Sequence, residues 1–489
     1  MAAASAAPTP PMIHLPPDGL PLTAFEEHML VDDRASHPMV IVARFDFHGV
    51  APVARLETAL ADVLQREPLL RARVERRPGR RLRWVPGPTP VLRQAGGGQA
   101  GDGQVSGAAI RTSLPRLDPW SGPVFHAEVV SHAVGWSLVV AVHHAVCDGL
   151  GLIGFIERWF LAVEDKPPRR RWSDAELTAA LAGRGRVAAT WRGFLTLLPR
   201  LRPGLAGIRQ YVSRRVASLR GTGYDSAGGP GRSSAGPAPE ASWCPTILTT
   251  TLEPAVEEAV ERQAREAGVR VNDVLAAAFI AAVGSQLDRK PGTVQQGDRW
   301  IRLGVPMSLR TKSDHALPAA NRVSMVFLDR RIADRHEFQR LVRSVHDELE
   351  LIRSHDLGHI FPLSLAASRW LPGGLERTTD SPEPQATAVL SNLGTCFWRS
   401  PLVDAEGVVH VGGSRLEGWW MVPPVRPGTA VAAATHETSG RRTLAVSVDE
   451  TVVTAAEVKP LLAAFLAVLR GAAGWAEADV TFPEGMVAS

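Results

Sequence analysis

Segments with the pattern of a strand alternate with segments that have helical spacing in the first half of the chain. Runs rich in β-branched and aromatic residues at 38–47, 124–130 and 136–144 predict strands. Between them, the stretch 53–67 predicts an amphipathic helix, because its apolar residues recur every three or four positions. These residues are Val53, Leu56, Leu60, Val63 and Leu64. A further helix is expected over 150–163, so strands and helices alternate in this half.

The same alternation returns in the second half. The sequence predicts strands at 246–252, 300–310, 321–331, 386–394, 414–424, 430–440 and 443–449, and helices at 253–268, 271–287, 335–355 and 455–474. Either Asn272 or Asp273 is expected to cap the helix that begins near 271.

A segment rich in glycine, serine and proline separates the two blocks of strands and helices and is typical of a linker. We therefore predict an α/β protein with two halves of similar size. The expected organisation is a disordered tail at 1–20, a first half at 21–220, a linker at 221–242 and a second half at 243–489.

Composition places the chain among ordinary globular proteins. Of its 489 residues, 45% are hydrophobic and 21% are charged, and the formal net charge of +4 gives no reason to expect a nucleic-acid partner. The three cysteines form no CxxC pair, which disfavours a disulfide framework and a structural zinc site. No stretch has the pattern of a signal peptide or the length of a membrane span. A cytoplasmic location is the expectation.

Two adjacent histidines, His143 and His144, stand where a predicted strand ends, and Asp148 and Gly149 follow four residues later. Alternation along the strand sends the two imidazoles to opposite faces, which disfavours a shared metal ion. Other readings are a Cys147 nucleophile beside His144, or buried histidines with Asp148 as a helix cap. In the remaining reading, one imidazole is a general base, and a buried Asp148 would then require a cation such as arginine.

The segment "HHAVCDG" resembles the HHxxxDG motif of the superfamily that contains condensation domains and chloramphenicol-acetyltransferase-like acyltransferases. Further segments resemble this superfamily in the same order along the chain, and the closest branch is that of wax ester synthases and diacylglycerol acyltransferases. They are "LETALADVLQREPLLRARV", "VNDVLAAAFIAAV", "VPMSLR", "NRVSMV" and "AVLSNLG". The resemblance covers nearly the whole chain outside the two low-complexity stretches.

The resemblance implies a pseudo-dimer of two acetyltransferase-like α/β halves, with the active site in a tunnel at their interface. His144 corresponds to the general base and His143 to a supporting residue. Asp148 corresponds to a structural aspartate, and Arg310 lies where its salt-bridge partner is found. Gly149 corresponds to a position of close backbone approach.

Asn321, Ser391 and Asn392 fall in segments that line the channel of the superfamily and could contact substrate or the oxyanion. The alternative is that Asn321 is a turn residue and that Ser391 and Asn392 merely end a strand. The resemblance implies no metal and no cofactor. A thioester of coenzyme A, or of an acyl carrier protein, is the expected co-substrate.

Three functions follow from the resemblance. The favoured one is transfer of an acyl group from acyl-CoA to a hydroxyl or amine, including that of a lipid or long-chain alcohol. The second is a freestanding condensation-type enzyme that uses a carrier-protein thioester. The third is a non-catalytic binding relative, against which the intact motif argues. Leucines and arginines in 194–220 predict a helix that either packs on the first half or rests on an anionic membrane.

Overall fold

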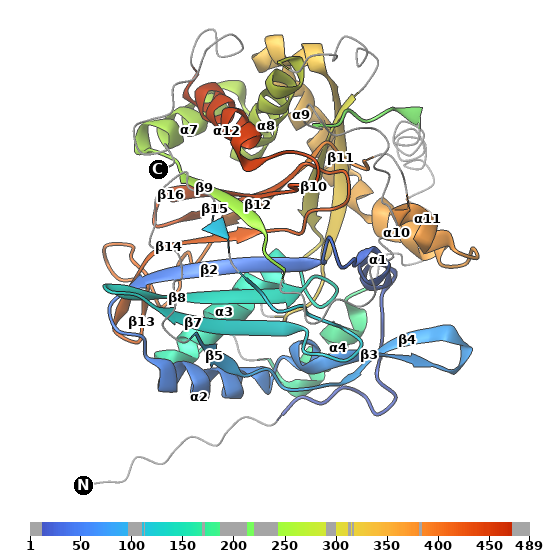
Figure 1. Ribbon diagram of the computed structural model, residues 1–489, viewed down its shortest axis with the longest axis vertical. Coiled ribbons are helices and arrows are strands. Elements are labelled where there is room, and N and C mark those ends of the chain that lie inside the picture. The colour runs from blue at the N-terminus through green and yellow to red at the C-terminus, as the bar shows by residue number, and fades with distance from the viewer. Residues whose placement is uncertain are drawn as a thin grey trace.

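The computed structural model describes residues 12–95, 110–111, 113–168, 172–185, 213–219, 243–289, 300–311, 314, 317–380 and 384–471. The predicted linker at 221–242 and most of the 194–220 segment lie outside these residues. The fold is mixed α/β, with two large sheets between two outer layers of helices (Figure 1). This is the fold class that the sequence predicts.

One large sheet has six strands and the other has seven. The six-stranded sheet has the order β13 (His410–Val411), β14 (Ser414–Val422), β2 (Val40–His48), β8 (Gly135–His143), β7 (Phe125–Ser131) and β5 (Leu92–Gln94). The seven-stranded sheet has the order β11 (Val323–Arg331), β10 (Trp300–Ser308), β12 (Ala388–Thr395), β15 (Val431–Thr438), β16 (Arg441–Val448), β9 (Thr246–Thr251) and β6 (Ile110–Arg111). A small sheet joins β1 (Leu20–Pro21), β4 (Arg81–Pro86) and β3 (Ala72–Arg77).

The helices cover the outer faces of the two large sheets (Figure 1). On the side of the six-stranded sheet they are α2 (Val53–Leu64), α3 (Gly149–Val163) and α4 (Asp174–Gly183). On the side of the seven-stranded sheet they are α7 (Pro254–Ala267), α8 (Val271–Asp288), α9 (Phe338–Ser354) and α12 (Ala455–Arg470). Three shorter helices, α1 (Ala24–Asp32), α10 (Ile360–Ser368) and α11 (Gly374–Thr379), lie together at one end of the molecule.

The two large sheets do not correspond fully to the first and second halves of the sequence. Strand β14 comes late in the chain, yet it pairs with β2 in the six-stranded sheet, with Val422 opposite Val42. In return, the short β6 from the first half pairs with β9 at the edge of the seven-stranded sheet. The two halves therefore exchange strands and cannot separate as independent bodies without breaking sheet hydrogen bonds.

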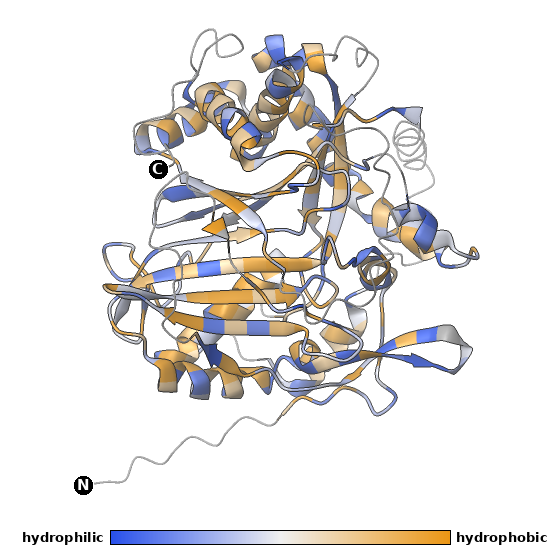
Figure 2. Ribbon diagram, viewed as in Figure 1, coloured by the Kyte–Doolittle hydropathy of each residue, from blue (hydrophilic) through white to orange (hydrophobic). Residues whose placement is uncertain are grey.

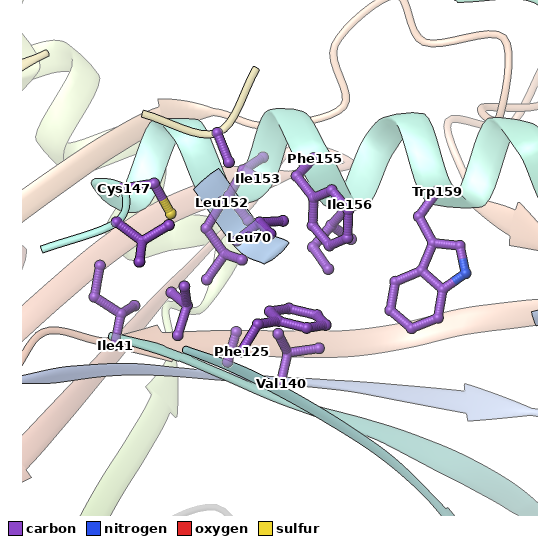
Figure 3. Close-up of a cluster of buried hydrophobic side chains, with 14 of the residues drawn as sticks. Ile41, Leu70, Phe125, Val140, Cys147, Leu152, Ile153, Phe155, Ile156 and Trp159 are labelled. Atoms are coloured by element: carbon purple, nitrogen blue, oxygen red, sulfur yellow. The ribbon is translucent and has the colours of Figure 1, made fainter. Parts of the chain in front are cut away.

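Alternation along β8 explains how one strand serves two cores. One face carries Leu138, Val140 and Val142, which pack with α2 and α3 in the larger core (Figure 3). The other face carries Val139 and Ala141, which belong to a smaller apolar cluster between the two sheets. Both faces of β8 are therefore apolar, as its hydropathy colouring shows (Figure 2).

Helix α8 begins differently from the prediction. Its N-cap is Arg270, and neither Asn272 nor Asp273 holds that place. Asp273 is fully buried inside the first turn, where its Oδ2 accepts the Arg270 backbone N–H at 3.1 Å and lies 2.7 Å from His346 Nδ1. The Asp273 carboxylate thus accepts a backbone N–H at the start of the helix, although Asp273 is the third helical residue and not the cap. The sequence pattern alone does not distinguish these two positions.

No single helix in the described part of the chain is long and apolar enough to cross a membrane. Helices α7 and α8 reach the required length and composition only when taken together, across a bend of 107°.

Candidate active site

The two histidines lie where β8 passes into α3. The strand ends at His143, and the next residue is held by a backbone hydrogen bond from the His144 N–H to the Met39 carbonyl at 2.6 Å. Asp148 is the N-cap of α3, and its Oδ1 accepts the Gly151 N–H at 2.8 Å. A strand end and a helix start, only five residues apart, thus fix the position of His144.

The His144 ring is oriented by its own turn. Its Nδ1 lies 3.2 Å from the carbonyl oxygen of Cys147, and because a carbonyl only accepts, we assign the ring proton to Nδ1. Nε2 therefore keeps a lone pair. Burial lowers the pKa of His144, and hydrogen bonding to backbone carbonyls and the charge of Asp148 offset this only in part. The imidazole is therefore neutral at pH 7 and able to accept a proton at Nε2.

The neighbouring thiol is not placed to act as a nucleophile. Cys147 is fully buried, and its side chain belongs to the core cluster that also contains Ile41, Leu70 and Leu152 (Figure 3). Burial raises the pKa of Cys147 well above its usual value, so the thiol is protonated. The structure therefore disfavours the reading in which Cys147 forms a covalent intermediate.

Asp148 and Arg310 form the ion pair that the resemblance implies. Arg310 Nη1 donates to Asp148 Oδ2 at 2.6 Å, and the side chains are 10% and 3% exposed. The same oxygen accepts the backbone N–H of Arg322 at 2.7 Å. With the Gly151 N–H, the carboxylate accepts three hydrogen bonds, two of them from the second half of the chain. It therefore ties α3 to a segment more than 160 residues away.

The segment 317–322 is held against the histidine turn by side chains on both of its sides. Glu67 Oε2 accepts the Ala319 N–H at 2.6 Å, and Arg310 Nη2 donates to the Ala320 carbonyl at 2.9 Å. Glu67 is 1% exposed and also accepts from Arg158 Nε at 2.8 Å. Sequence reasoning missed Glu67, because no local pattern distinguishes it from a solvated glutamate at a helix end.

Asn321 joins the segment 317–322 to the histidine turn by side-chain hydrogen bonds. Its Nδ2 donates to the carbonyls of His144 and Ala145 at 2.8 and 2.9 Å, so both amide N–H groups are used within the protein. No amide N–H of Asn321 is then left to donate to an oxyanion, whereas contact between Asn321 and a substrate stays a prediction. Its Oδ1 is buried and has no hydrogen-bond partner among the described residues. The observed contacts make Asn321 a support for the histidine turn.

The backbones of the two halves approach each other closely at Gly151. A Cβ at Gly149 would lie 3.0 Å from Leu393 Cδ2 and 3.3 Å from Met421 Sδ, both at the ends of flexible side chains. A Cβ at Gly151 would instead lie 3.0 Å from the Ala320 backbone oxygen. At Gly149 the second half contributes side-chain ends, and the backbone contact is made two residues later, at a glycine that the motif does not include.

Ser391 and Asn392 point to opposite sides of β12, as neighbours on a strand do. Asn392 Nδ2 lies 3.3 Å from Asn272 Oδ1 at the start of α8, on the outer side of the sheet. Leu393, just after Asn392, packs against the core of the other half and approaches Gly149. Ser391 therefore lies on the face of β12 that points away from α8.

No group of three or more His, Cys, Asp or Glu side chains able to hold a metal ion occurs in the described ranges.

Comparison with known proteins defines the fold. No family model and no curated protein matches the sequence. Solved structures do match over nearly the full chain. The first condensation domain of the calcium-dependent antibiotic synthetase, in complex with a substrate analogue, has a TM-score of 0.60 at 16% identity, covering 96% of this chain and 98% of that domain.

Two further neighbours have similar scores. A mutant starter condensation domain of rhizomide synthetase RzmA, in complex with C8-CoA and Leu-SNAC, has a TM-score of 0.59 at 14% identity, over 95% of this chain and 97% of that one. SgcC5 from Streptomyces globisporus, in complex with a naphthyl ethanediol and sucrose, has a TM-score of 0.59 at 16% identity, over 94% and 100%. The protein has the fold of condensation domains, with two acetyltransferase-like halves.

Proposed function

We propose that the protein is an acyltransferase that moves an acyl group from a thioester to a hydroxyl or amine of a small acceptor, with His144 as general base. The observation that carries this proposal is the contact between His144 Nδ1 and the Cys147 carbonyl, which leaves Nε2 with a free lone pair. Asp148, Arg310 and Asn321 hold the turn that presents this nitrogen. Such a rigid support matches the needs of proton transfer, which depends on the distance and angle of the donor.

In the proposed reaction, Nε2 of His144 removes the proton from the acceptor hydroxyl as its oxygen attacks the thioester carbonyl. The tetrahedral intermediate collapses and the carbon–sulfur bond breaks. The leaving thiolate then accepts the proton from the His144 imidazolium. The products are an ester and a free thiol, and no covalent enzyme intermediate forms. Ser391, on the face of β12 that points away from α8, is the proposed hydroxyl contact to the substrate.

Acyl-CoA is the donor that we favour. The RzmA neighbour was solved with C8-CoA, and the SgcC5 neighbour with a diol, which are the two kinds of substrate that the reaction needs. A carrier-protein thioester is the second candidate, because other neighbours are condensation domains of synthetases. A lipid or long-chain alcohol acceptor and contact with a membrane stay as proposals from the sequence, and most of the 194–220 segment on which the membrane proposal rests lies outside the described residues.

The test is acceptor-dependent release of thiol. The purified protein would be incubated with octanoyl-CoA, with octanoyl-N-acetylcysteamine or with an octanoyl-loaded carrier protein, each together with a panel of alcohols and amines. Thiol would be followed colorimetrically and the product by mass spectrometry. We expect thiol release that requires an acceptor, and a product whose mass equals acceptor plus acyl group. Activity only with a loaded carrier protein would favour the condensation-type alternative. No acceptor-dependent release from any of the three donor types would refute acyl transfer.

A further inference from the structure

The first histidine of the motif has a ring nitrogen that lacks a hydrogen-bond acceptor at normal distance. The His143 side chain is fully buried, and its Nδ1 accepts the backbone N–H of Ala145 at 3.2 Å. The ring proton must therefore be on Nε2. Among the described residues, Nε2 has no partner within hydrogen-bond distance. A buried N–H of this kind calls for a nearby acceptor.

The group that faces this N–H is the carboxylate of Asp33, at the C-terminal end of α1. Asp33 Oδ2 lies 3.7 Å from His143 Nε2, and the aspartate side chain is 13% exposed. Its other oxygen, Oδ1, accepts the Met39 N–H at 2.9 Å. The Met39 carbonyl in turn accepts the His144 N–H at 2.6 Å. One carboxylate thus faces the ring of the first histidine and is linked, through hydrogen bonds to one peptide unit, to the backbone of the second.

The charged residues around Asp33 are engaged elsewhere. Asp32 Oδ1 binds Arg426 at 2.6 Å, and His37 Nε2 lies 3.1 Å from Asp449 Oδ2. These contacts connect the end of α1 to the second half of the chain, whereas Asp33 turns toward β8. Helix α1 also supplies Phe25, whose ring meets the edge of the His144 ring at a centroid distance of 6.5 Å. The end of α1 therefore supports the histidine pair from one side.

We infer that Asp33 is a positioning residue for the base. Its carboxylate holds His143 in the tautomer with the proton on Nε2, which leaves Nδ1 free to accept the Ala145 N–H and shape the turn. Through its hydrogen bond to Met39, Asp33 also fixes the position of the His144 backbone. The inference concerns how the base of the proposed function is placed, and in that respect it rests on that function. Asp33 lies outside the motif and over 100 residues before it.

The variant that tests this role is Asp33→Asn. An asparagine is uncharged and has one acceptor oxygen, so it cannot both accept the Met39 N–H and present a carboxylate oxygen to His143 Nε2. We expect kcat to fall about tenfold to a hundredfold, because a small displacement of a catalytic group costs that much, with KM for the thioester little changed. Asp33→Glu keeps two acceptor oxygens and should recover part of kcat. The matched control is Asp380→Asn, which removes an exposed carboxylate, paired with Arg34 at 2.9 Å, and should leave kcat unchanged.

A readout independent of activity separates this role from the proposed function. In protein labelled with ¹⁵N-histidine, the ring signals of His143 report which nitrogen carries the proton, and His143→Gln identifies them by their loss. We expect a neutral ring with the proton on Nε2 in the natural protein, and changed His143 and His144 ring signals in Asp33→Asn. A proton on Nδ1 of His143 in the natural protein would overturn the inference, even if the variant failed to fold. So would an Asp33→Asn protein with unchanged ring signals, or one with unchanged kcat. Absence of all turnover in the natural protein would refute the proposed function. The ¹⁵N ring signals of His143 and His144 would then still test whether Asp33 positions the histidines.

Discussion

Replacing Arg310 by methionine removes the cation from a buried carboxylate that joins the two halves of the chain. Asp148 is 3% exposed and would keep two of its three hydrogen bonds, those from the Gly151 and Arg322 backbones at 2.8 and 2.7 Å. Removing one partner of a buried ion pair costs about 3–5 kcal/mol of unfolding free energy. Because two hydrogen bonds remain, we expect Arg310→Met to lie near the lower limit, at about 3 kcal/mol. Asp148→Ala loses all three and strands the guanidinium, so we expect about 5 kcal/mol.

The assay is urea unfolding followed by fluorescence and by circular dichroism. Asp148→Ala combined with Arg310→Met should cost less than the sum of the single changes, because the second change removes a charge already left unpaired. Arg340→Met is the control. It breaks a pair with Glu337 whose side chains are 80% and 66% exposed, and such surface pairs contribute about 0–1 kcal/mol. Single variants that each lose less than about 1 kcal/mol, or strictly additive losses, would refute the reasoning.

Three further predictions concern the thiol, the helix contact and acid stability. Cys147→Ala should leave turnover nearly unchanged, since its thiol is buried and protonated; loss of turnover with a covalent acyl-protein seen by mass spectrometry would speak against this. Gly151→Ala should lower the free energy of unfolding in urea by about 1–3 kcal/mol. Gly154→Ala on the same helix should not, because its Cβ would meet only the end of a flexible side chain at 3.4 Å; equal losses would contradict the close-approach argument. Burial, with a nearby arginine in each case, lowers the pKa of both His28 and His436 to about 3. The unfolded chain therefore binds more protons than the folded protein below about pH 6.5, and the urea midpoint should fall from pH 7.5 to pH 5. A urea midpoint that stays constant over this range would contradict the prediction.

Much of the fold follows from local patterns. The run at 136–144 and the helix after Asp148 appear in the structure as β8 and α3, because a run of β-branched and aromatic residues and helical spacing are both properties of neighbouring residues. The Asp148–Arg310 contact came from resemblance to a superfamily, and no spacing in the sequence connects residues so far apart.

Other features depend on contacts that a single sequence does not display. Strand β14 looks like any strand of the second half, and only its pairing with β2 puts it in the other sheet. Helices α10 and α11 lack a clear apolar stripe and were missed. Asp33 and Gly151 were missed for the same reason: an aspartate after a helix and a glycine inside one have common local explanations, and their importance arises from what packs against them.

The most direct test of the central claim is the rate of acceptor-dependent thiol release by His144→Ala against the natural protein. A general base contributes about 10²–10⁴-fold to turnover, so we predict a loss of that size in a variant that keeps the urea midpoint and circular dichroism of the natural protein. A folded His144→Ala protein that releases thiol and forms product at the natural rate would contradict the account.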